Sequence, residues 1–343
     1  MMPLVSILIP AHNAADWIAD TIQSAMAQTW KRTEIIVVDD GSSDQTLKIA
    51  RQFESESVRV VWQENQGAAA ARNKALSLCH GDYIQWLDAD DLLAPDKIAK
   101  QMEALHSGNS RRTLLSSSFG QFMYRPYRAR FTSTALWCDL TPIEFLRRKL
   151  GKRVFMQTAV WLVSRELTEA AGPWDTTMIS DDDGEYFCRV LLASDGVRFV
   201  RDARVYYRSV GTMRLSYVGR SNKKLEALWR SMQLHISYLR RLEDSEEVRT
   251  ACIRYLQNYL IDFYPLRLDI AEQMHKVARD LGGRLNAPRL SWKYSWIKAL
   301  FGWDLAKRAQ LFLPSVKWSL IRFWDKALFS IERRGIVRTD SEI

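Results

Sequence analysis

The chain has 343 residues, of which 47% are hydrophobic and 26% are charged, and its formal net charge is +9. This composition indicates one large folded domain or two domains, and it excludes a disordered chain. The four cysteines are widely spaced without a CxxC pair, which argues against a disulfide framework or a zinc site, and no run of about 18 apolar residues predicts a transmembrane helix.

Strands and helices are predicted to alternate along the first hundred residues. The apolar runs at 5–9, 34–38, 58–62 and 83–87 are predicted strands, and the segments 16–28, 44–53 and 67–78 are predicted helices. Because the apolar runs are short and a helix follows each of the first three, they are typical of strands that are covered on both faces. The pattern predicts an α/β domain with a largely parallel sheet.

Further along, the pattern becomes less regular. Strands are predicted at 114–124 and 155–163, helices at 142–150 and 183–193, and one or two strands within 197–207. After about residue 218 only helical spacing is found, at 221–242, 245–263 and 268–281, followed by two aromatic-rich helices. We therefore expect an α/β domain over residues 1–218 and a helical region over residues 219–343.

Two aspartates, Asp88 and Asp90, directly follow the apolar run 83–87. The carboxyl edge of an open α/β sheet is where ligands bind. A carboxylate pair at that edge suits a hard divalent cation that takes further oxygen ligands from phosphates. The alternative is a solvated acidic turn before a helix that Pro95 could begin.

Polar residues also follow the first two predicted strands. Pro10 and Asn13 come after the first, and Asp39 and Asp40 end the second. An aspartate at a strand end can accept hydrogen bonds from a nucleobase or a ribose. The segment 42–44 can equally cap the next helix, and the two roles are compatible.

The segment 65–73 contains small residues and one arginine, Arg72. Small residues let a ligand approach the backbone closely, and Arg72 can counter a diphosphate. The alanine run 68–71 is also explained by a helix packed tightly against the sheet, and we favour that explanation for the alanines.

Four carboxylates lie within five residues at a predicted helix start, namely Asp181, Asp182, Asp183 and Glu185. Their mutual repulsion raises the pKa of some of them, which makes this segment a candidate for a general base. The positive end of the helix dipole opposes that rise. A solvated acidic helix cap is the alternative.

Together these segments resemble the family 2 glycosyltransferases, which are inverting enzymes with the GT-A fold. The matching pieces are residues 5–13, Ser24 with 28–29, 37–44, Gly67, 71–73, 81–84, 87–91 with Pro95, and 182–185 with Arg189. The match is dense over residues 4–96 and sparser to about residue 210. The resemblance implies a GT-A nucleotide-diphospho-sugar transferase fold, a Rossmann-like and mostly parallel sheet, with a helical C-terminal extension.

The resemblance also implies a role for each candidate residue. Asp40, with Asp39, would hold the base and ribose of the donor, and Asp88 and Asp90 would coordinate Mg²⁺ or Mn²⁺ at its diphosphate. Asp183 would deprotonate the acceptor hydroxyl, with Asp182 as the neighbouring candidate. The expected donor-binding residues are Pro10, Asn13, Asp39, Asp40, Arg72 and Asp88.

Two positions depart from the family pattern. Many relatives have a tyrosine where this chain has His12, and many have a metal-binding histidine where this chain has the segment 206–209. His235 lies too far along the chain to replace that histidine. Arg208 and Arg214 are candidates for a direct contact with the diphosphate.

The expected function is transfer of a sugar, with inversion, from a nucleotide-diphosphate donor to a hydroxyl of a glycan or a lipid-linked acceptor. The resemblance favours UDP sugars as donors and cell-surface polysaccharide synthesis as the process. Two alternatives use the same carboxylates: a nucleotidyl- or phosphoryl-transferring α/β enzyme, and a catalytically silent nucleotide-sugar binding protein.

The C-terminal segment is strongly basic. Residues 284–334 hold 11 Lys and Arg against three acidic residues, so most of the net charge lies there. Lysines and arginines alternate with aromatic residues at helical spacing, which suits a helix in the interface of an anionic membrane. We expect a cytoplasmic protein with the inner face of the cell membrane as a candidate partner. Packing on its own domain or on a second subunit is the alternative, and nucleic acid is disfavoured because no recognition motif accompanies the charge.

Overall fold

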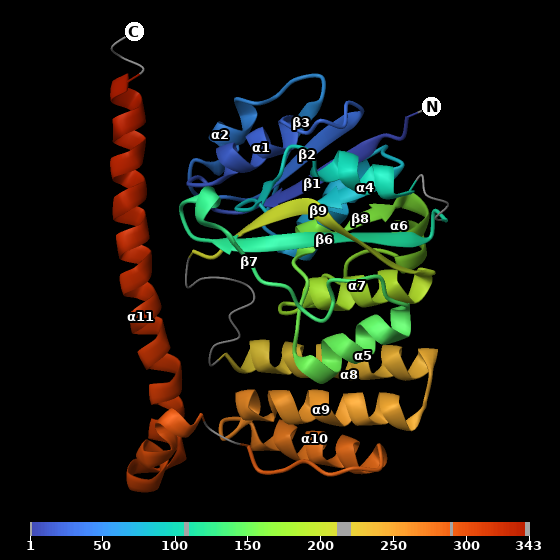
Figure 1. Cartoon of the computed structure of the whole chain (residues 1–343), viewed down its shortest axis with the longest axis vertical. Coiled ribbons are helices and arrows are strands. Elements are labelled where there is room, and N and C mark those ends of the chain that lie inside the picture. Colours follow the sequence, from blue (N-terminus) through green and yellow to red (C-terminus); the bar gives the residue numbers. More distant parts are fainter. Residues whose placement is uncertain (1, 106–109, 211–220, 289–290, 340–343) are drawn as a thin grey trace.

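The computed structural model describes residues 2–105, 110–210, 221–288 and 291–339. In these residues one nine-stranded sheet has the order β3-β2-β1-β4-β8-β6-β9-β5, with β7 paired to β6 (Figure 1). Its strands are β1 (Val5–Ala11), β2 (Thr33–Asp40), β3 (Val58–Gln63), β4 (Tyr83–Trp86), β5 (Leu92–Leu93), β6 (Thr113–Phe122), β7 (Arg130–Phe131), β8 (Leu162–Ser164) and β9 (Gly196–Arg208).

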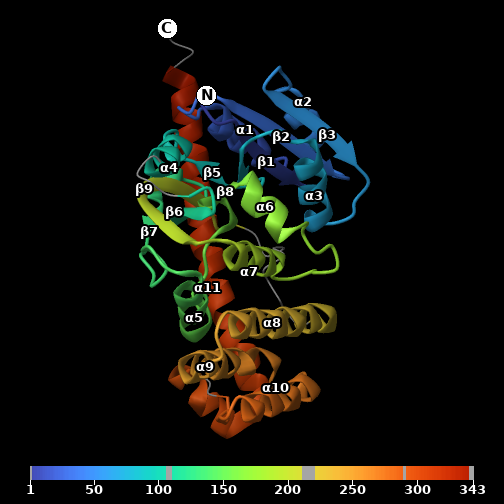
Figure 2. The same ribbon diagram turned by 90° about the vertical axis from the view of Figure 1, so that its right-hand side faces the viewer.

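The helices of the described residues cover the sheet and continue below it as a stack (Figures 1 and 2). They are α1 (Ile18–Met26), α2 (Thr46–Arg51), α3 (Ala68–Leu78), α4 (Lys97–Leu105), α5 (Pro142–Lys152), α6 (Arg165–Ala171), α7 (Asp182–Ala193), α8 (Asn222–Leu242), α9 (Glu246–Phe263), α10 (Leu268–Asp280) and α11 (Ser295–Thr339).

The N-terminal half of the sheet is parallel, as the sequence predicts. Strand β1 pairs in parallel with β2 and β4, and β2 pairs in parallel with β3. All seven residues of β1 are buried, and Ala69, Ala71 and Ala75 of α3 are buried in the same core. Because parallel strands run in the same direction, the carboxyl ends of β1, β2 and β4 meet at one edge of the sheet.

The other half of the sheet is mixed. Strand β8 is antiparallel to β4 and β6, whereas β9 is parallel to β6. The predicted strand at 155–163 is wrong over most of its length, because Thr158–Val160 is a short 3₁₀ helix and only Leu162–Ser164 is a strand. The Gln157 side chain accepts a hydrogen bond from the Ala159 backbone N–H and donates one to the buried Asp91, and these bonds hold the segment out of the sheet.

The helical region agrees closely with the sequence prediction. Helices α8, α9 and α10 form successive layers below α7 (Figure 1). Each buries one apolar face, as the helical spacing of its hydrophobic residues requires. The predicted domain boundary at residue 218 and the candidate Arg214 lie outside the described residues.

Helix α11 runs alongside the helical stack and then beside the sheet (Figures 1 and 2). It is broken at Gly302, whose φ of 80° is not helical, so it consists of two helices, as predicted. Asp325 and Glu332 pair with Arg125 in the segment between β6 and β7. In contrast, Phe323 and Trp324 are 69% and 66% exposed. Within the described part of the chain, no helix has the length and hydropathy that crossing a membrane requires.

Candidate active site

A cavity of about 1860 Å³ opens at the carboxyl edge of the parallel strands. Most of the residues that the sequence singled out line it together, although they come from five separate segments of the chain. These are Pro10, Asn13, Asp40, Arg72, Asp88, Asp90 and Asp183. The fold therefore brings the predicted donor, metal and base residues to a single site.

Asp40 organises one wall of the cavity. Its carboxylate accepts hydrogen bonds from Gln63 Nε2 at 2.7 Å and from the backbone N–H groups of Gln66 and Gly67 at 3.0 and 2.8 Å. Gly41 turns the chain after Asp40 with a φ of +68°, and a Cβ there would lie 2.7 Å from the Asn65 backbone nitrogen. Asp40 thus fixes the loop that leads into α3.

Asn13 connects the loops that follow β1 and β2. Its side-chain oxygen accepts a hydrogen bond from the Ser43 backbone N–H at 2.9 Å, and its own backbone N–H donates to Ser42 Oγ at 3.0 Å. Asn13 has a φ of 49°, in the left-handed region that asparagine tolerates better than most residues. Pro10 and His12 line the cavity beside it.

Asp39 differs from its neighbour. It is fully buried and is not among the residues that line the cavity. Its Oδ1 accepts a hydrogen bond from the Ser42 backbone N–H at 3.1 Å, whereas its Oδ2 is buried without a hydrogen-bond partner. The expected contact of Asp39 with the nucleotide therefore remains a prediction.

Arg72 links two acidic groups across the cavity. One guanidinium nitrogen lies 2.8 Å from Asp88 Oδ1 and another lies 2.6 Å from Asp182 Oδ2. The guanidinium is nearly buried and stacks on the Trp174 ring at 4.4 Å. The two carboxylates hold the pKa of Arg72 above its ordinary value against the opposing effect of burial. Arg72 therefore remains a cation that neutralises part of the acidic charge of this site.

Arg208 fixes the conformation of the loop that follows β4. This arginine is 1% exposed, stacks on Trp17 at 4.2 Å and donates a hydrogen bond from Nε to the Asp90 carbonyl at 2.7 Å. Its backbone N–H donates to Asp91 Oδ1 at 2.8 Å. Arg208 is not among the residues that line the cavity, and it positions the Asp88–Asp91 loop. Its expected contact with the diphosphate remains a prediction.

The two carboxylates of this loop, Asp88 and Asp90, fit a divalent cation that is bound together with a substrate. Asp88 and Asp90 both line the cavity, and Mg²⁺ is commonly held by one or two carboxylates plus substrate phosphates. Among the residues that the structure describes, no three or more His, Cys, Asp or Glu residues form a cluster that could hold a metal ion. The remaining ligands would then have to come from the donor diphosphate and water.

The acidic segment at the start of α7 places three aspartates in three different environments. Asp181 has a left-handed backbone and points its carboxylate over Gly184, where a Cβ would collide with it. Asp182 is paired with Arg72. Asp183 lines the cavity and accepts a hydrogen bond from the Gly184 backbone N–H at 2.8 Å.

Asp183 combines contact with the cavity and a raised pKa. Burial, followed by the nearby charges of Asp182 and Asp181, raises the pKa of Asp183 to about 7, although Arg72 and Lys149 oppose the rise. Thr158 Oγ1 lies 3.5 Å from its Oδ2. A carboxyl group that exchanges its proton near neutral pH and faces a cavity is suited to act as a general base.

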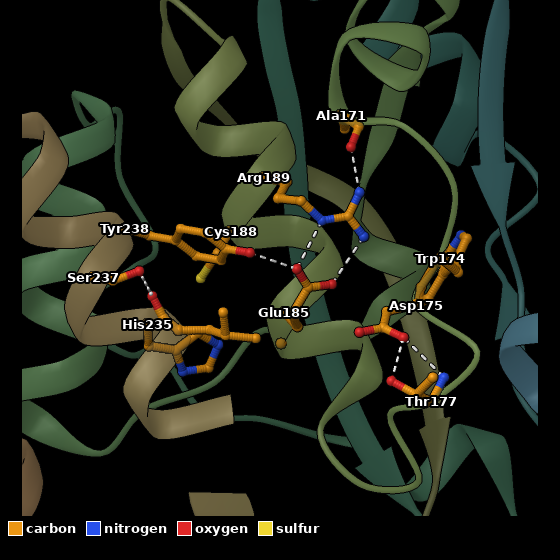
Figure 3. Close-up of polar contacts among 12 residues, drawn as sticks. Ala171, Trp174, Asp175, Thr177, Glu185, Cys188, Arg189, His235, Ser237 and Tyr238 are labelled. Atoms are coloured by element: carbon orange, nitrogen blue, oxygen red, sulfur yellow. Dashed lines mark hydrogen bonds and ion pairs between the residues drawn. The ribbon is translucent and has the colours of Figure 1, made fainter. Parts of the chain in front are cut away.

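Glu185 and Arg189 anchor α7 from its other side (Figure 3). Arg189 donates to both oxygens of Glu185, at 2.7 and 2.8 Å, and Tyr238 of α8 donates to Glu185 Oε1 at 2.8 Å. Neither Glu185 nor Arg189 lines the cavity. Their contacts orient the helix that carries Asp183.

His235 is buried in α8 behind the same helix (Figure 3). Its Nδ1 lies 3.0 Å from the Tyr255 hydroxyl and its Nε2 lies 3.7 Å from Asp181 Oδ2. It does not line the cavity, which agrees with the expectation that it does not replace the family histidine.

Several cavity residues escaped the sequence analysis. Trp17, Gln157 and Thr158 line the cavity beside the acidic groups, and Trp174 supports Arg72. Trp17 lies within the predicted helix 16–28, and Gln157 and Thr158 lie within the predicted strand 155–163. The local pattern contains no signal for them, because each acts on a residue that is distant in the sequence.

Comparisons with known proteins agree with this architecture. Residues 6–170 match the family model described as Glycosyl transferase family 2. A putative teichuronic acid biosynthesis glycosyltransferase of Bacillus subtilis, TuaG, is 47% identical over 104 residues, which are 29% of this chain and 41% of that protein. The chain spans less than half of the length of the curated relatives that it matches here.

Two solved structures share the fold. S. aureus TarS 1–349 in complex with UDP-GlcNAc has a TM-score of 0.63 at 18% identity, covering 81% of this chain and 80% of that one. The mannosyltransferase PcManGT from Pyrobaculum calidifontis, in complex with GDP-Man and Mn²⁺, has a TM-score of 0.53 at 19% identity, covering 94% and 85%. These similarities establish the fold as that of GT-A transferases, and the expected fold class is confirmed.

Proposed function

Residues 6–170 belong to glycosyl transferase family 2, and from this premise we propose that the protein transfers a sugar, with inversion, from a nucleotide-diphosphate donor to an acceptor hydroxyl. The acceptor is a glycan or a lipid-linked molecule, and the process is cell-surface polysaccharide synthesis. The observation that carries the proposal is the convergence of Asp40, Asp88, Asp90 and Asp183 in one cavity. The similarity to TuaG supports the process.

In this proposal the wall formed by Pro10, Asn13 and Asp40 binds the nucleoside. The Oδ2 atom of Asp39 is buried without a hydrogen-bond partner. After a small rearrangement it would accept a hydrogen bond from an N–H group of the nucleobase. UDP sugars are the first expectation for the donor, and the UDP-GlcNAc bound by TarS is consistent with it.

Asp88 and Asp90 would hold Mg²⁺ or Mn²⁺ at the donor diphosphate. A bound cation supplies Lewis-acid stabilisation of the charge that develops on the leaving nucleoside diphosphate. The Mn²⁺ in the PcManGT structure supports this assignment. Arg72, which pairs with Asp88, contributes a fixed positive charge to the same region.

Asp183 would be the general base. It accepts the proton of the acceptor hydroxyl as that oxygen forms a bond to the anomeric carbon. The bond from this carbon to the diphosphate oxygen breaks at the same time, and the nucleoside diphosphate leaves with the electron pair. Asp182 is less suited to this role, because Arg72 holds one of its oxygens in an ion pair at 2.6 Å.

Analysis of the reaction products tests the proposal. Purified protein is incubated with UDP sugars, Mn²⁺ and an acceptor mixture, and the products are identified by mass spectrometry. Free UDP together with a glycosylated acceptor is the expected result. A nucleotide attached to the product would instead indicate nucleotidyl transfer, and donor binding without any turnover across a broad acceptor panel would indicate a silent binding protein.

The proposed base predicts a pH dependence. Because Asp183 must be deprotonated to act and its pKa is raised to about 7, kcat/KM should rise with pH, with an apparent pKa near 7, and then level off. The profile is measured with saturating metal between pH 5.5 and 9. If kcat/KM is flat from pH 5.5 upwards, Asp183 is already ionised in the free enzyme and the assigned pKa is wrong.

We also propose that α11 associates with an anionic membrane surface. Trp318, Leu320, Phe323, Trp324 and Ile331 are all more than half exposed, and Lys326 is an exposed basic residue in the same segment. Lys293 and Lys298 are exposed ahead of the break at Gly302. Aromatic and basic residues in this combination suit a helix that lies in a membrane interface. Each basic residue near the surface contributes about 1 kcal/mol of attraction to anionic lipid.

Vesicle co-sedimentation measures this association. The full-length protein should sediment with vesicles of anionic phospholipid at low salt, and less of it should sediment at high salt. The partition coefficient of the double variant Phe323→Ser/Trp324→Ser should be at least tenfold lower than that of the wild type. Trp62→Ser is the matched control, because Trp62 is 53% exposed on β3. Equal sedimentation of the double variant and the wild type would show that this face does not bind membrane.

A further inference from the structure

The active-site cavity is larger than a donor site needs. Its volume of about 1860 Å³ exceeds the roughly 300–1,000 Å³ of ordinary small-molecule pockets. Asp40, Asp88 and Asp183 line one part of it, and residues of α8, of the α9–α10 connection and of α11 line another. We call this second part the helical arm of the cavity.

The helical arm is defined by six apolar residues: Leu225, Leu228, Leu266, Trp296, Phe301 and Leu305. The two residues from α8 are buried, whereas the other four are between 45% and 61% exposed. Large apolar side chains that remain exposed on a concave wall mark a site for an apolar ligand.

Two cationic side chains of the cavity near the arm, Lys307 and Arg153, are engaged within the protein. Lys307 Nζ donates hydrogen bonds to the Ile261 and Asp262 carbonyls at 2.8 and 3.1 Å, near the end of α9. Arg153 pairs with the Asp262 carboxylate at 2.7 Å and lies over the Tyr259 ring at 4.1 Å. An acceptor sugar needs hydrogen-bonding groups for its hydroxyls, and the leucines of the arm offer none.

From this chemistry we infer that the helical arm binds the hydrocarbon tail of a lipid-linked acceptor. The inference rests on the proposed function, since it places the acceptor's polar head toward Asp183 in the same cavity. Burying the tail against the leucines and aromatic rings removes its apolar surface, and theirs, from water. The tail thereby holds the reacting hydroxyl in the site and selects lipid-linked acceptors over free glycans.

The position of α11 supports a tail as the occupant. Phe301 lines the cavity, while its neighbour Leu300 is 70% exposed and does not line it. Beyond Gly302, α11 carries further exposed apolar residues outside the cavity, Trp318, Leu320 and Phe323, and it runs beside the sheet (Figure 2). A chain longer than the arm can leave the cavity along these residues toward a membrane.

Binding of n-alkyl maltosides to the full-length protein tests the inference, because their head is constant and only the tail varies. Hexyl, octyl and decyl maltoside are titrated by calorimetry below their micelle concentrations. For the wild type, Kd should fall by about two- to fourfold for each added methylene, the upper value being that for a fully buried CH₂. In each of the variants Phe301→Gln and Leu305→Gln, the fold-change in Kd per added methylene should be at least twofold smaller than in the wild type.

Leu300→Gln is the matched control and should keep the wild-type dependence, since Leu300 is exposed outside the cavity. A Kd that does not change with chain length, an equal loss in Leu300→Gln, or tighter binding of maltohexaose than of decyl maltoside would each overturn the inference. Donor turnover is measured separately with Mn²⁺. A protein that binds tails without consuming any nucleotide sugar would retain the tail site and refute the proposed function.

Discussion

Replacing Asp183 by asparagine is expected to lower kcat by about 10²–10⁴-fold, the usual contribution of a positioned general base. Asparagine keeps the shape of the side chain and its hydrogen bond from the Gly184 N–H, but it cannot accept the acceptor's proton. The donor KM should stay within about twofold of the wild-type value, because the nucleoside wall lies on β1 and β2. Steady-state kinetics with saturating donor and acceptor measure both parameters.

Asp182→Asn is the matched comparison. It removes the carboxylate that pairs with Arg72, so we expect a smaller loss that reflects a displaced arginine. Should Asp182→Asn abolish turnover while Asp183→Asn retains it, the base would be Asp182. If neither substitution affects kcat, deprotonation of the acceptor does not depend on this segment.

Removal of divalent cations is expected to abolish transfer. In the proposed site only Asp88 and Asp90 contribute protein ligands, so a chelator such as EDTA should strip the cation readily, and added Mn²⁺ or Mg²⁺ should restore activity. Asp90→Asn should lower kcat/KM by about 10²–10³-fold, since Lewis-acid stabilisation amounts to several kcal/mol and each 1.36 kcal/mol is tenfold in rate.

Asp96→Asn is the control for that variant. Asp96 lies six residues further along, is 47% exposed and forms a surface pair with Lys100, so its loss should leave kcat/KM within about twofold of the wild type. Full activity in metal-free buffer, or equal effects of the two substitutions, would remove the metal assignment from Asp88 and Asp90.

Local sequence patterns determined the N-terminal architecture and most helix bounds. Buried parallel strands need continuous apolar runs, and helices need apolar residues every three or four positions, so both can be read without tertiary information. The polar residues that end β1, β2 and β4 could be assigned to one site for a similar reason, because parallel strands bring their carboxyl ends to a common edge.

Only the tertiary structure distinguished residues that look alike in the sequence. Asp182 and Asp183 are adjacent and identical, and both line the cavity, yet Asp182 pairs with Arg72, which is 110 residues away, whereas Asp183 has a raised pKa. Asp39 and Asp40 likewise diverge, since Asp40 lines the cavity and Asp39 does not. Such differences depend on which groups surround each carboxylate, and sequence order does not encode that.

The same reason explains the wrong strand at 155–163 and the unforeseen helical arm. Gln157 leaves the sheet because it bonds to the distant Asp91, and the arm exists because α11 returns beside α8 and α9. A run of apolar residues, or apolar residues at helical spacing, predicts that one face of a strand or helix is shielded from water. The packing of remote segments decides whether protein or a ligand shields it.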